Sequence, residues 1–421
     1  MKSRDLYLRC RFMQWYIILA NKFSANKAKS FSKSVTKLAI ITVSLSVAIM
    51  LLSIAIVTEF QSAIKSKITG LSGDLIIESI TNVQNGEQEV LSTVEAKELE
   101  FIKSLNGIKN ASLGLNKPCI IKGEEEIEGL VARAVDEDYP FRFIKDFMVQ
   151  GRVPNFRLDS NEVIISSVTA AKIGLKLNTR LLMMFFKNDS SGTRATALNP
   201  KIVGVFNTGI SEYDNHTLYT SKSAMARVLN PNESFSQMEI FLLESANTDS
   251  VVTRIQENIN PAKFQLKTAG EFNWQIFEWL KILDTNVWVI IAIMVLVAAI
   301  TMCTTILIII TEKTNTIGML KAMGATNGEM QKLFLVQAAK IAVFGLLFGN
   351  AIAFAIGFIQ TKTKFIKLNS DTYYLDHVVL DFQWQHILLI NGFSLVLIIL
   401  IMMIPVTIIS KLNPIKSIRF N

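Results

Sequence analysis

Residues 287–310 read VWVIIAIMVLVAAITMCTTILIII, an apolar run that contains no charged side chain. A helix needs about 20 predominantly apolar residues to cross the hydrocarbon core of a bilayer, and this run is long enough. Half of the whole sequence is hydrophobic, and its mean hydropathy is positive. The excess of apolar residues is therefore concentrated in segments that suit a membrane rather than spread through a larger soluble core.

Three further stretches meet the same requirement, so the sequence predicts four transmembrane helices, at residues 38–57, 287–310, 337–359 and 387–409. The first of them is too long, and too far from the N-terminus, for a cleavable signal peptide, and no small-residue cleavage site follows it. A shorter apolar stretch, Phe12–Ala20, lies between basic residues and suits an amphipathic helix in the membrane interface.

The basic residues indicate how the spans are oriented. The segment before the first span contains one acid, Asp5, and nine bases: Lys2, Arg4, Arg9, Arg11, Lys22, Lys27, Lys29, Lys33 and Lys37. Lysines and arginines also occupy the link between the second and third spans and the C-terminal tail. Cytoplasmic loops are enriched in these residues, so both termini should be cytoplasmic and residues 58–286 should lie outside.

We therefore expect this order along the chain: a basic cytoplasmic arm with an interfacial helix (1–37), span one (38–57), a large extracytoplasmic domain with flanking stalk helices (58–286), span two (287–310), a cytoplasmic coupling segment (311–336), span three (337–359), an outer loop (360–386), span four (387–409) and a cytoplasmic tail (410–421). A basic arm beside a membrane span sets orientation and contacts anionic lipid, so nucleic acid is not an expected partner.

The outer domain is expected to be α+β. Strand-like apolar runs begin at residues 74, 162, 201 and 238, and helical patterns cover 168–173 and 251–259. Apolar residues also recur at helical spacing just outside the membrane, after span one (Phe60, Ile64, Ile68 and Leu71) and before span two (Phe272, Ile276, Leu280 and Leu283). These segments predict two helical stalks, the first of which is expected to stop at Gly70.

The coupling segment contains the motif that bears on mechanism, EKTNTIGMLKAMGA at residues 312–325. Ile317, Leu320 and Met323 are spaced to share one side of a short helix that Gly324 can end, and the TNGE sequence that follows fits a capping box. Such a helix would present an apolar knob to the groove of a cytoplasmic partner. A tight connector lying on lipid headgroups fits the same residues equally well.

The sequence offers no chemistry of its own. We find no phosphate-binding loop for ATP, no nucleophile with an adjacent base and no paired carboxylates, so the chain is not expected to be an enzyme or to hold a cofactor. Cys10, Cys119 and Cys303 have neither zinc-ligand spacing nor a disulfide framework, and the three histidines are scattered. No metal site is expected.

The motif at residues 312–325 resembles the coupling segment of FtsX-like ABC permeases. The C-terminal LNPIKSIR (412–419) and the exit from span one, KITGLSGD (67–74), resemble the same family. The layout of one span, a large outer domain and three further spans is similar to the lipoprotein-releasing permeases of the LolC/LolE type. Within the outer domain, residues 162–176 also resemble that group.

The resemblance implies a permease subunit in the inner membrane. It would pair with a second copy or a paralogue, bind a cytoplasmic ABC ATPase dimer and use ATP hydrolysis to extract lipoproteins from the outer leaflet of the inner membrane. In the family, the stalks carry motion to the MacB-like outer domain, which is called mechanotransmission. The lipoprotein would then pass to a periplasmic carrier. ATPase coupling would fall to Glu312, Lys313, Ile317, Gly318, Leu320, Lys321, Met323 and Gly324.

The resemblance also implies two sites outside the coupling segment. A groove for acyl chains between the first two spans would include Met50, Ile54, Val57, Ile291 and Val295. For any single one of them, an ordinary lipid-facing or interhelical position is the preferred interpretation. A hairpin that binds the carrier in one family member matches the stretch 187–196, which contains Arg194, between strands at 181–186 and 201–206. Its sequence departs from the family pattern, and an ordinary exposed loop is the preferred interpretation.

Three other functions fit the sequence less well. A regulatory FtsX-like subunit that activates an extracytoplasmic cell-wall hydrolase is the main alternative, but its outer domain is usually much shorter than residues 58–286. Exporters of peptides or antibiotics usually carry a fused ATPase or more spans. A membrane enzyme would need a catalytic constellation that this sequence lacks.

Overall fold

The computed structural model describes residues 31–79, 96–123, 126–137, 139–156, 160–189, 192–227, 237–261 and 263–408. The predicted interfacial helix at Phe12–Ala20 and the C-terminal tail lie outside these ranges. The chain divides into two compact units. We call residues 31–60, 281–366 and 378–408 the membrane unit, and residues 61–280 and 367–377 the outer unit.

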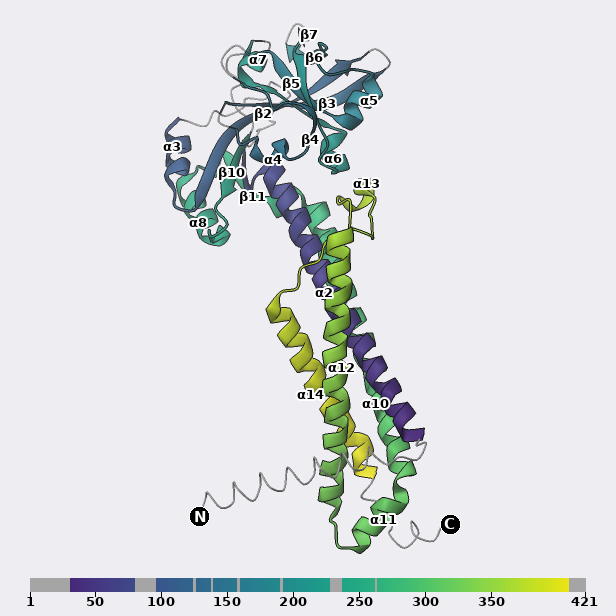
Figure 1. Ribbon diagram of the computed structural model, residues 1–421. Helices are drawn as coiled ribbons and strands as arrows, with labels where there is room; N and C mark the ends of the chain where they lie inside the picture. The colour runs from purple at the N-terminus through teal and green to yellow at the C-terminus, as the bar shows by residue number, and fades with distance from the viewer. Residues whose placement is uncertain are drawn as a thin grey trace. The chain divides into compact units, whose positions relative to one another are not determined.

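Four helices of the described chain are long and apolar enough to cross a membrane, and each predicted span falls within one of them, apart from residue 409, which is not described. They are α2 (Phe31–Ser72), α10 (Trp274–Glu312), α12 (Asn327–Thr363) and α14 (Trp384–Ile408). Figure 1 shows the short helix α11 (Thr314–Ala322) at the turn between α10 and α12.

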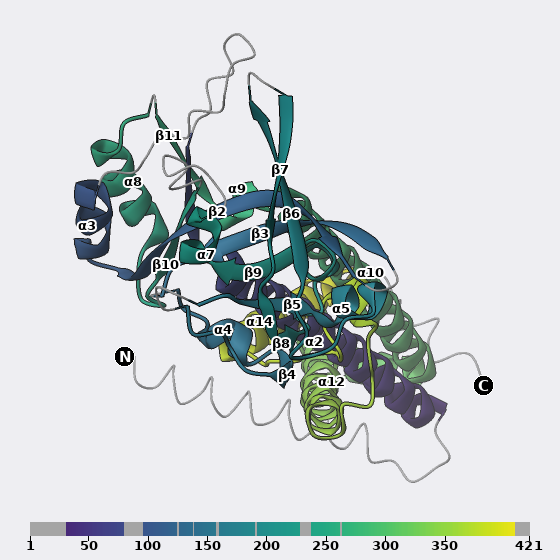
Figure 2. The same cartoon turned by 90° about the horizontal axis from the view of Figure 1, so that it is seen from above.

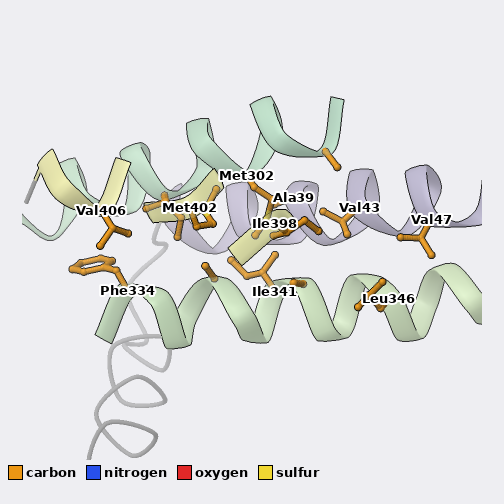
Figure 3. Close-up of a cluster of buried hydrophobic side chains, with 14 of the residues drawn as sticks. Ala39, Val43, Val47, Met302, Phe334, Ile341, Leu346, Ile398, Met402 and Val406 are labelled. Atoms are coloured by element: carbon orange, nitrogen blue, oxygen red, sulfur yellow. The ribbon is translucent and has the colours of Figure 1, made fainter. Parts of the chain in front are cut away.

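The core of the membrane unit is formed by aliphatic side chains from all four helices, among them Val43, Met302, Ile341 and Met402 (Figure 3). Two glycines let α12 approach α2 closely. A Cβ at Gly345 would lie 2.5 Å from Val43, and one at Gly349 would lie 2.8 Å from Val47. Small residues four apart are a common means of bringing membrane helices together when no hydrophobic effect drives their association.

Helices α12 and α14 are joined by a reciprocal amide pair. The Asn350 Nδ2 group donates to Asn391 Oδ1 at 2.7 Å, and Asn391 Nδ2 donates back to Asn350 Oδ1 at 3.1 Å. Polar side chains are costly in hydrocarbon unless they bind one another, so this pair fixes the register of the two helices.

The outer unit is built on a single mixed sheet with the order β11-β1-β10-β2-β3-β9-β5-β8-β4, and β6 and β7 branch from β2. The strands are β1 (Leu75–Ser79), β2 (Ile108–Lys122), β3 (Ile127–Val135), β4 (Met148–Gly151), β5 (Glu162–Ser166), β6 (Leu182–Asp189), β7 (Gly192–Leu198), β8 (Lys201–Phe206), β9 (Thr217–Ser221), β10 (Gln237–Leu242) and β11 (Phe264–Thr268). The α+β architecture and the four strands predicted at residues 74, 162, 201 and 238 are confirmed.

The long strand β2 is shared by two hydrophobic cores. Its first half pairs with β10, where α3 (Ala96–Ser104) and α8 (Thr248–Asn258) complete one core. Its second half pairs with β3, and the other core there includes Ile173 of α5 (Ser167–Ile173) and Met225 of α7 (Lys222–Ala226). Shorter helices, α4 (Arg142–Lys145), α6 (Ser211–Asp214) and α9 (Ala269–Phe272), lie in the connections.

The stalk residues predicted after span one are buried, and Gln61 of α2 donates to the Leu280 carbonyl of α10 at 2.8 Å within the outer unit. The predicted stop at Gly70 is wrong. Helix α2 continues to Ser72 and ends at Gly73, whose φ is +83°. Gly70 instead makes room for the Phe143 ring, which would lie 2.5 Å from a Cβ there. The second stalk is also interrupted, because Phe272 belongs to α9 and α10 begins at Trp274.

Candidate functional site

The residues after α11 end that helix and start α12. Gly324 has a φ of +98°, a left-handed conformation that favours glycine. Thr326 then caps α12, because its hydroxyl accepts from the Glu329 amide while the Glu329 carboxylate accepts from the Thr326 amide at 2.8 Å. The predicted short helix, glycine stop and capping box are all present.

The predicted apolar knob is divided between two sides of α11. Ile317 is only 1% exposed and belongs to the membrane-unit core, and Leu320 packs against the same core. Met323 is 84% exposed, and Met319, one helical turn before it, is 54% exposed. The side chains that α11 presents outward are therefore Met319 and Met323, while Ile317 and Leu320 anchor the helix. Sequence reasoning missed Met319 because it counted the three-residue spacing from the buried Ile317.

The remaining coupling residues take three different positions. Gly318 is buried beside Ile317 on the anchored side of α11. Lys313 is the N-cap of α11, and its Nζ lies 3.7 Å from a carboxylate oxygen of Glu312. Lys321 lies in the last turn, where a positive charge interacts favourably with the C-terminal end of the helix dipole.

All five groove residues lie in or against the membrane-unit core. Met50 and Ile291 are buried members of that core, and Ile54, Val57 and Val295 are half-buried against it. That core extends through all four spanning helices, and the grouping of these five residues as an acyl-chain groove stays a prediction.

The stretch at residues 187–196 is part of a two-stranded hairpin rather than an open loop. Its strands are β6 and β7, which pair from Met183↔Leu198 to Asp189↔Gly192, and Arg194 lies opposite Lys187. Only residues 182–184 of β6 pair with β2, so the hairpin extends past the sheet, as Figure 2 shows. The stretch does lie between strands β6 and β8, as expected, and the additional strand β7 completes the hairpin. The side chain of Arg194 is outside the described residues.

The base of the hairpin carries an apolar surface. Gly129, Ile120, Met184 and Ala197 form one row across β3, β2, β6 and β7. The adjoining rows add Ile127, which is 62% exposed, and Phe186, which is 53% exposed. The exposed Lys122 lies between Ile127 and Leu182 in one of these rows and adds a positive charge to the apolar surface. We call this group the hairpin face; its members are Pro118, Ile120, Ile127, Gly129, Leu182, Met184, Phe186, Ala195 and Ala197. Alternate residues on these strands, such as Met183 and Phe185, point into the opposite core.

Among the described residues, no cluster of three or more histidine, cysteine, aspartate or glutamate side chains could hold a metal ion. Cys119 is buried, and burial raises the pKa of its thiol to about 12. A thiol in that environment is a packing residue and not a nucleophile.

Comparison with known families matches both units. The profile of the MacB-like periplasmic core domain matches residues 36–259, more than half of the chain, and the profile of the FtsX-like permease C-terminal domain matches residues 288–414. The second match includes the coupling segment and α11.

Curated relatives are similar over nearly the whole chain at low identity. The lipoprotein-releasing system transmembrane protein LolC of Neisseria meningitidis serogroup B is 19% identical over 408 residues, covering 94% of this chain and 96% of its own length. The uncharacterized ABC transporter permease YknZ of Bacillus subtilis is 20% identical over 342 residues, covering 78% of this chain and 80% of its own length.

Among solved structures, the periplasmic region of MacB from Actinobacillus actinomycetemcomitans is 10% identical, with a TM-score of 0.36, and the match covers 50% of this chain and 95% of that one. The two family matches account for all four spans and for the domain inserted between the first two. The protein is a membrane protein and the non-catalytic permease subunit of an ABC transporter, and it belongs to the FtsX-like permeases that carry a MacB-like periplasmic core domain.

Proposed function

We propose that this chain, working with a partner ATPase and a second permease copy or paralogue, extracts lipoproteins from the outer leaflet of the inner membrane and passes them to a periplasmic carrier. Both termini would be cytoplasmic and the outer unit periplasmic. The observation that carries the proposal is the hairpin of β6 and β7, which extends past the sheet and bears exposed apolar residues at its base. Exposed apolar surface rimmed by polar residues is typical of a protein-binding site.

Lipoprotein release needs a motor because acyl chains hold their protein in the bilayer by about 0.8 kcal/mol per buried methylene. The coupling segment supplies a place for the motor to act. Met319 and Met323 project from α11, and flexible methionine side chains suit a partner's apolar groove. Since Ile317 and Leu320 fix α11 to the membrane-unit core, movement of α11 would be passed to α10 and α12.

The test is reconstitution of the full chain with its candidate ATPase, a lipoprotein and a carrier in vesicles. Met323→Asp should uncouple ATP hydrolysis from release, because it places a charge in the docking contact without disturbing the buried Ile317. Met323→Leu, which keeps the apolar surface, should behave as wild type. Leu320→Asp is a poorer probe, since Leu320 packs on the core.

A second arm of the same experiment addresses the carrier. Phe186→Ser should reduce transfer to the carrier while ATP hydrolysis continues, because Phe186 is exposed and its loss leaves the core intact. Transfer that is unchanged in Phe186→Ser would exclude the hairpin face as the carrier site. Copurification of a cell-wall hydrolase, with no release activity, would favour the regulatory alternative.

A further inference from the structure

The outer loop between α12 and α14 is a folded hairpin. The Val378 amide donates to the Ile366 carbonyl at 3.1 Å, Lys367 and His377 form a β-bridge, and the Leu368 amide donates to the Asp376 carbonyl at 2.9 Å. The short helix α13 (Ser370–Tyr373) forms its tip. We call residues 366–378 the loop hairpin. Successive cross-strand hydrogen bonds of this kind stiffen a connection that would otherwise be a flexible linker.

The base of the loop hairpin is fixed to α12 by one buried side chain. The Gln360 Nε2 group donates to the Ile366 carbonyl at 3.2 Å and to the Val378 carbonyl at 3.0 Å, and the Gln360 Oε1 atom accepts from the Ile366 amide at 2.9 Å. A single amide thus holds both ends of the loop hairpin, and all three residues belong to the membrane unit.

The tip of the loop hairpin belongs to the outer unit, and Tyr374 fixes it to the rest of that unit. Its carbonyl accepts from Lys67 Nζ at 2.7 Å, and its hydroxyl donates to Glu212 Oε1 at 3.0 Å. Its ring lies edge-on to Trp279, with centroids 6.0 Å apart. Burial and the Glu212 carboxylate raise the pKa of Tyr374 to about 12, so the hydroxyl remains a donor at physiological pH.

Lys67 is itself held in place by the outer unit. Its Nζ also donates to the Thr208 carbonyl at 3.0 Å and lies 5.1 Å from the centre of the Phe147 ring. Asp214 fixes Thr208, because the Asp214 carboxylate accepts from the Thr208 hydroxyl at 2.9 Å. The contact with Tyr374 is therefore made by a preorganised group rather than by a free surface lysine.

The backbone of Tyr374 supports a specialised role. Its φ is +59°, a left-handed conformation that is uncommon for a residue with a large side chain. Such a conformation persists only where surrounding contacts determine it. Here the carbonyl, the hydroxyl and the ring of one residue each contact another residue of the outer unit: Lys67, Glu212 and Trp279.

We propose that the loop hairpin is a second mechanical connection, through which α12 moves the outer unit by acting on Lys67 of the α2 stalk, Trp279 of the α10 stalk and Glu212 of α6. Helix α12 starts at the capping box after α11 and runs for 37 residues, about 55 Å at 1.5 Å per residue, to the C-cap beside Gln360. The chain crosses between the two units at both ends of the loop hairpin as well as in α2 and α10. Transmission of ATP-driven motion rests on the proposed function; the docking of the loop hairpin does not.

The docking is tested by hydrogen–deuterium exchange on the full chain in nanodiscs without nucleotide. Peptides covering residues 366–378 should be protected in the wild type, and Tyr374→Ala should raise their exchange at least about tenfold, because exchange reports local opening. Tyr373→Ala is the matched control, since Tyr373 is exposed and should leave the protection unchanged. Wild-type exchange at the rate of an open loop, or an unchanged rate in Tyr374→Ala, would overturn the docking.

Transmission is tested in the reconstituted transporter. Tyr374→Ala should lower the lipoprotein released per ATP hydrolysed by at least about fivefold, the lower end of usual coupling factors, with hydrolysis retained. Tyr374→Phe keeps the ring against Trp279 and loses the hydrogen bond to Glu212. Its release of lipoprotein per ATP hydrolysed should therefore lie between the values for the wild type and for Tyr374→Ala. Equal coupling in Tyr374→Ala and wild type would refute transmission. If the wild type hydrolyses ATP without release, the proposed function fails, and transmission to the outer unit fails with it, while the exchange experiment still decides the docking.

Discussion

The reactivity of a single side chain, Cys119, shows whether the outer unit is folded. It lies in the core of the sheet, and its raised pKa of about 12 reduces the thiolate at neutral pH by about 1,000-fold relative to an ordinary thiol. In a chain whose Cys10 and Cys303 are replaced by serine and alanine, maleimide should not modify Cys119 until urea unfolds the outer unit. Mass spectrometry over time measures this, and rapid labelling of the folded chain would contradict the buried position.

Arg133 and Glu239 form a buried ion pair between β3 and β10. Arg133 also donates to the Tyr219 hydroxyl at 3.3 Å, and Gln237 donates to Glu239 at 2.5 Å. Burial raises the pKa of Glu239, and the guanidinium of Arg133 opposes that shift. Glu239→Gln leaves a buried positive charge without its counter-charge, which should reduce the free energy of unfolding by about 3–5 kcal/mol.

The urea midpoint of Cys119 labelling measures that loss. Lys267→Met is the matched control, because it removes a partly exposed ion pair with Glu78 and should cost no more than about 1 kcal/mol. Similar midpoints for the two variants would show that the Arg133–Glu239 pair contributes little. Sequence could not identify this pair, since an arginine and a glutamate 106 positions apart carry no spacing signal and only the strand register brings them together.

Among the helices and turns, two glycines of the coupling segment allow the effect of backbone conformation to be measured apart from the effect of side-chain packing. A Cβ at Gly324 or at Gly328 would meet nothing within 4 Å, but only Gly324 has a positive φ, +98°. Gly324→Ala should therefore cost about 1–2 kcal/mol of backbone strain and reorient α11 relative to α12. Gly328→Ala, within the first turn of α12, should be neutral or stabilising.

The measurement for the glycine pair is the release of lipoprotein per ATP hydrolysed, together with the thermal stability of the reconstituted transporter. Gly324→Ala is expected to lower the coupling, whereas Gly328→Ala is expected to match the wild type. Equal coupling in both variants would mean that the left-handed turn has no part in transmission.

Sequence patterns predicted elements well where apolar residues are continuous or the capping chemistry is local. The four spans, the strands β1, β5, β8 and β10 and the cap of α12 are of this kind. Strand β7 was missed because GTRATAL contains few apolar residues and pairs only with β6. The stop at Gly70 was wrong because tertiary contact with Phe143, rather than the end of a helix, requires that glycine.

In the whole molecule, sequence predicted the class and the order of the helices and the inserted domain, but not the two surfaces for which we propose a function. The hairpin face is assembled from β2, β3, β6 and β7, and its residues become neighbours only through the register of the sheet. The fixed loop hairpin has the same origin, since Lys67 and Tyr374 are separated by 307 positions. Hydropathy and charge act locally along the chain, and so they report spans and orientation but not such contacts.

Orientation across the membrane is the prediction on which the proposed function depends, and two exposed positions test it. By the positive-inside rule, the lysines around α11 predict that this turn is cytoplasmic, and a chain with four spans is then expected to have its outer unit in the periplasm. Cysteine at Ile127, 62% exposed in the outer unit, should react with a membrane-impermeant maleimide in intact spheroplasts. Cysteine at Met323, 84% exposed on the coupling segment, should react only after the membrane is permeabilised. Both positions are accessible in the folded chain, so the opposite labelling pattern would place the outer unit in the cytoplasm, where it could neither receive a lipoprotein nor meet a periplasmic carrier.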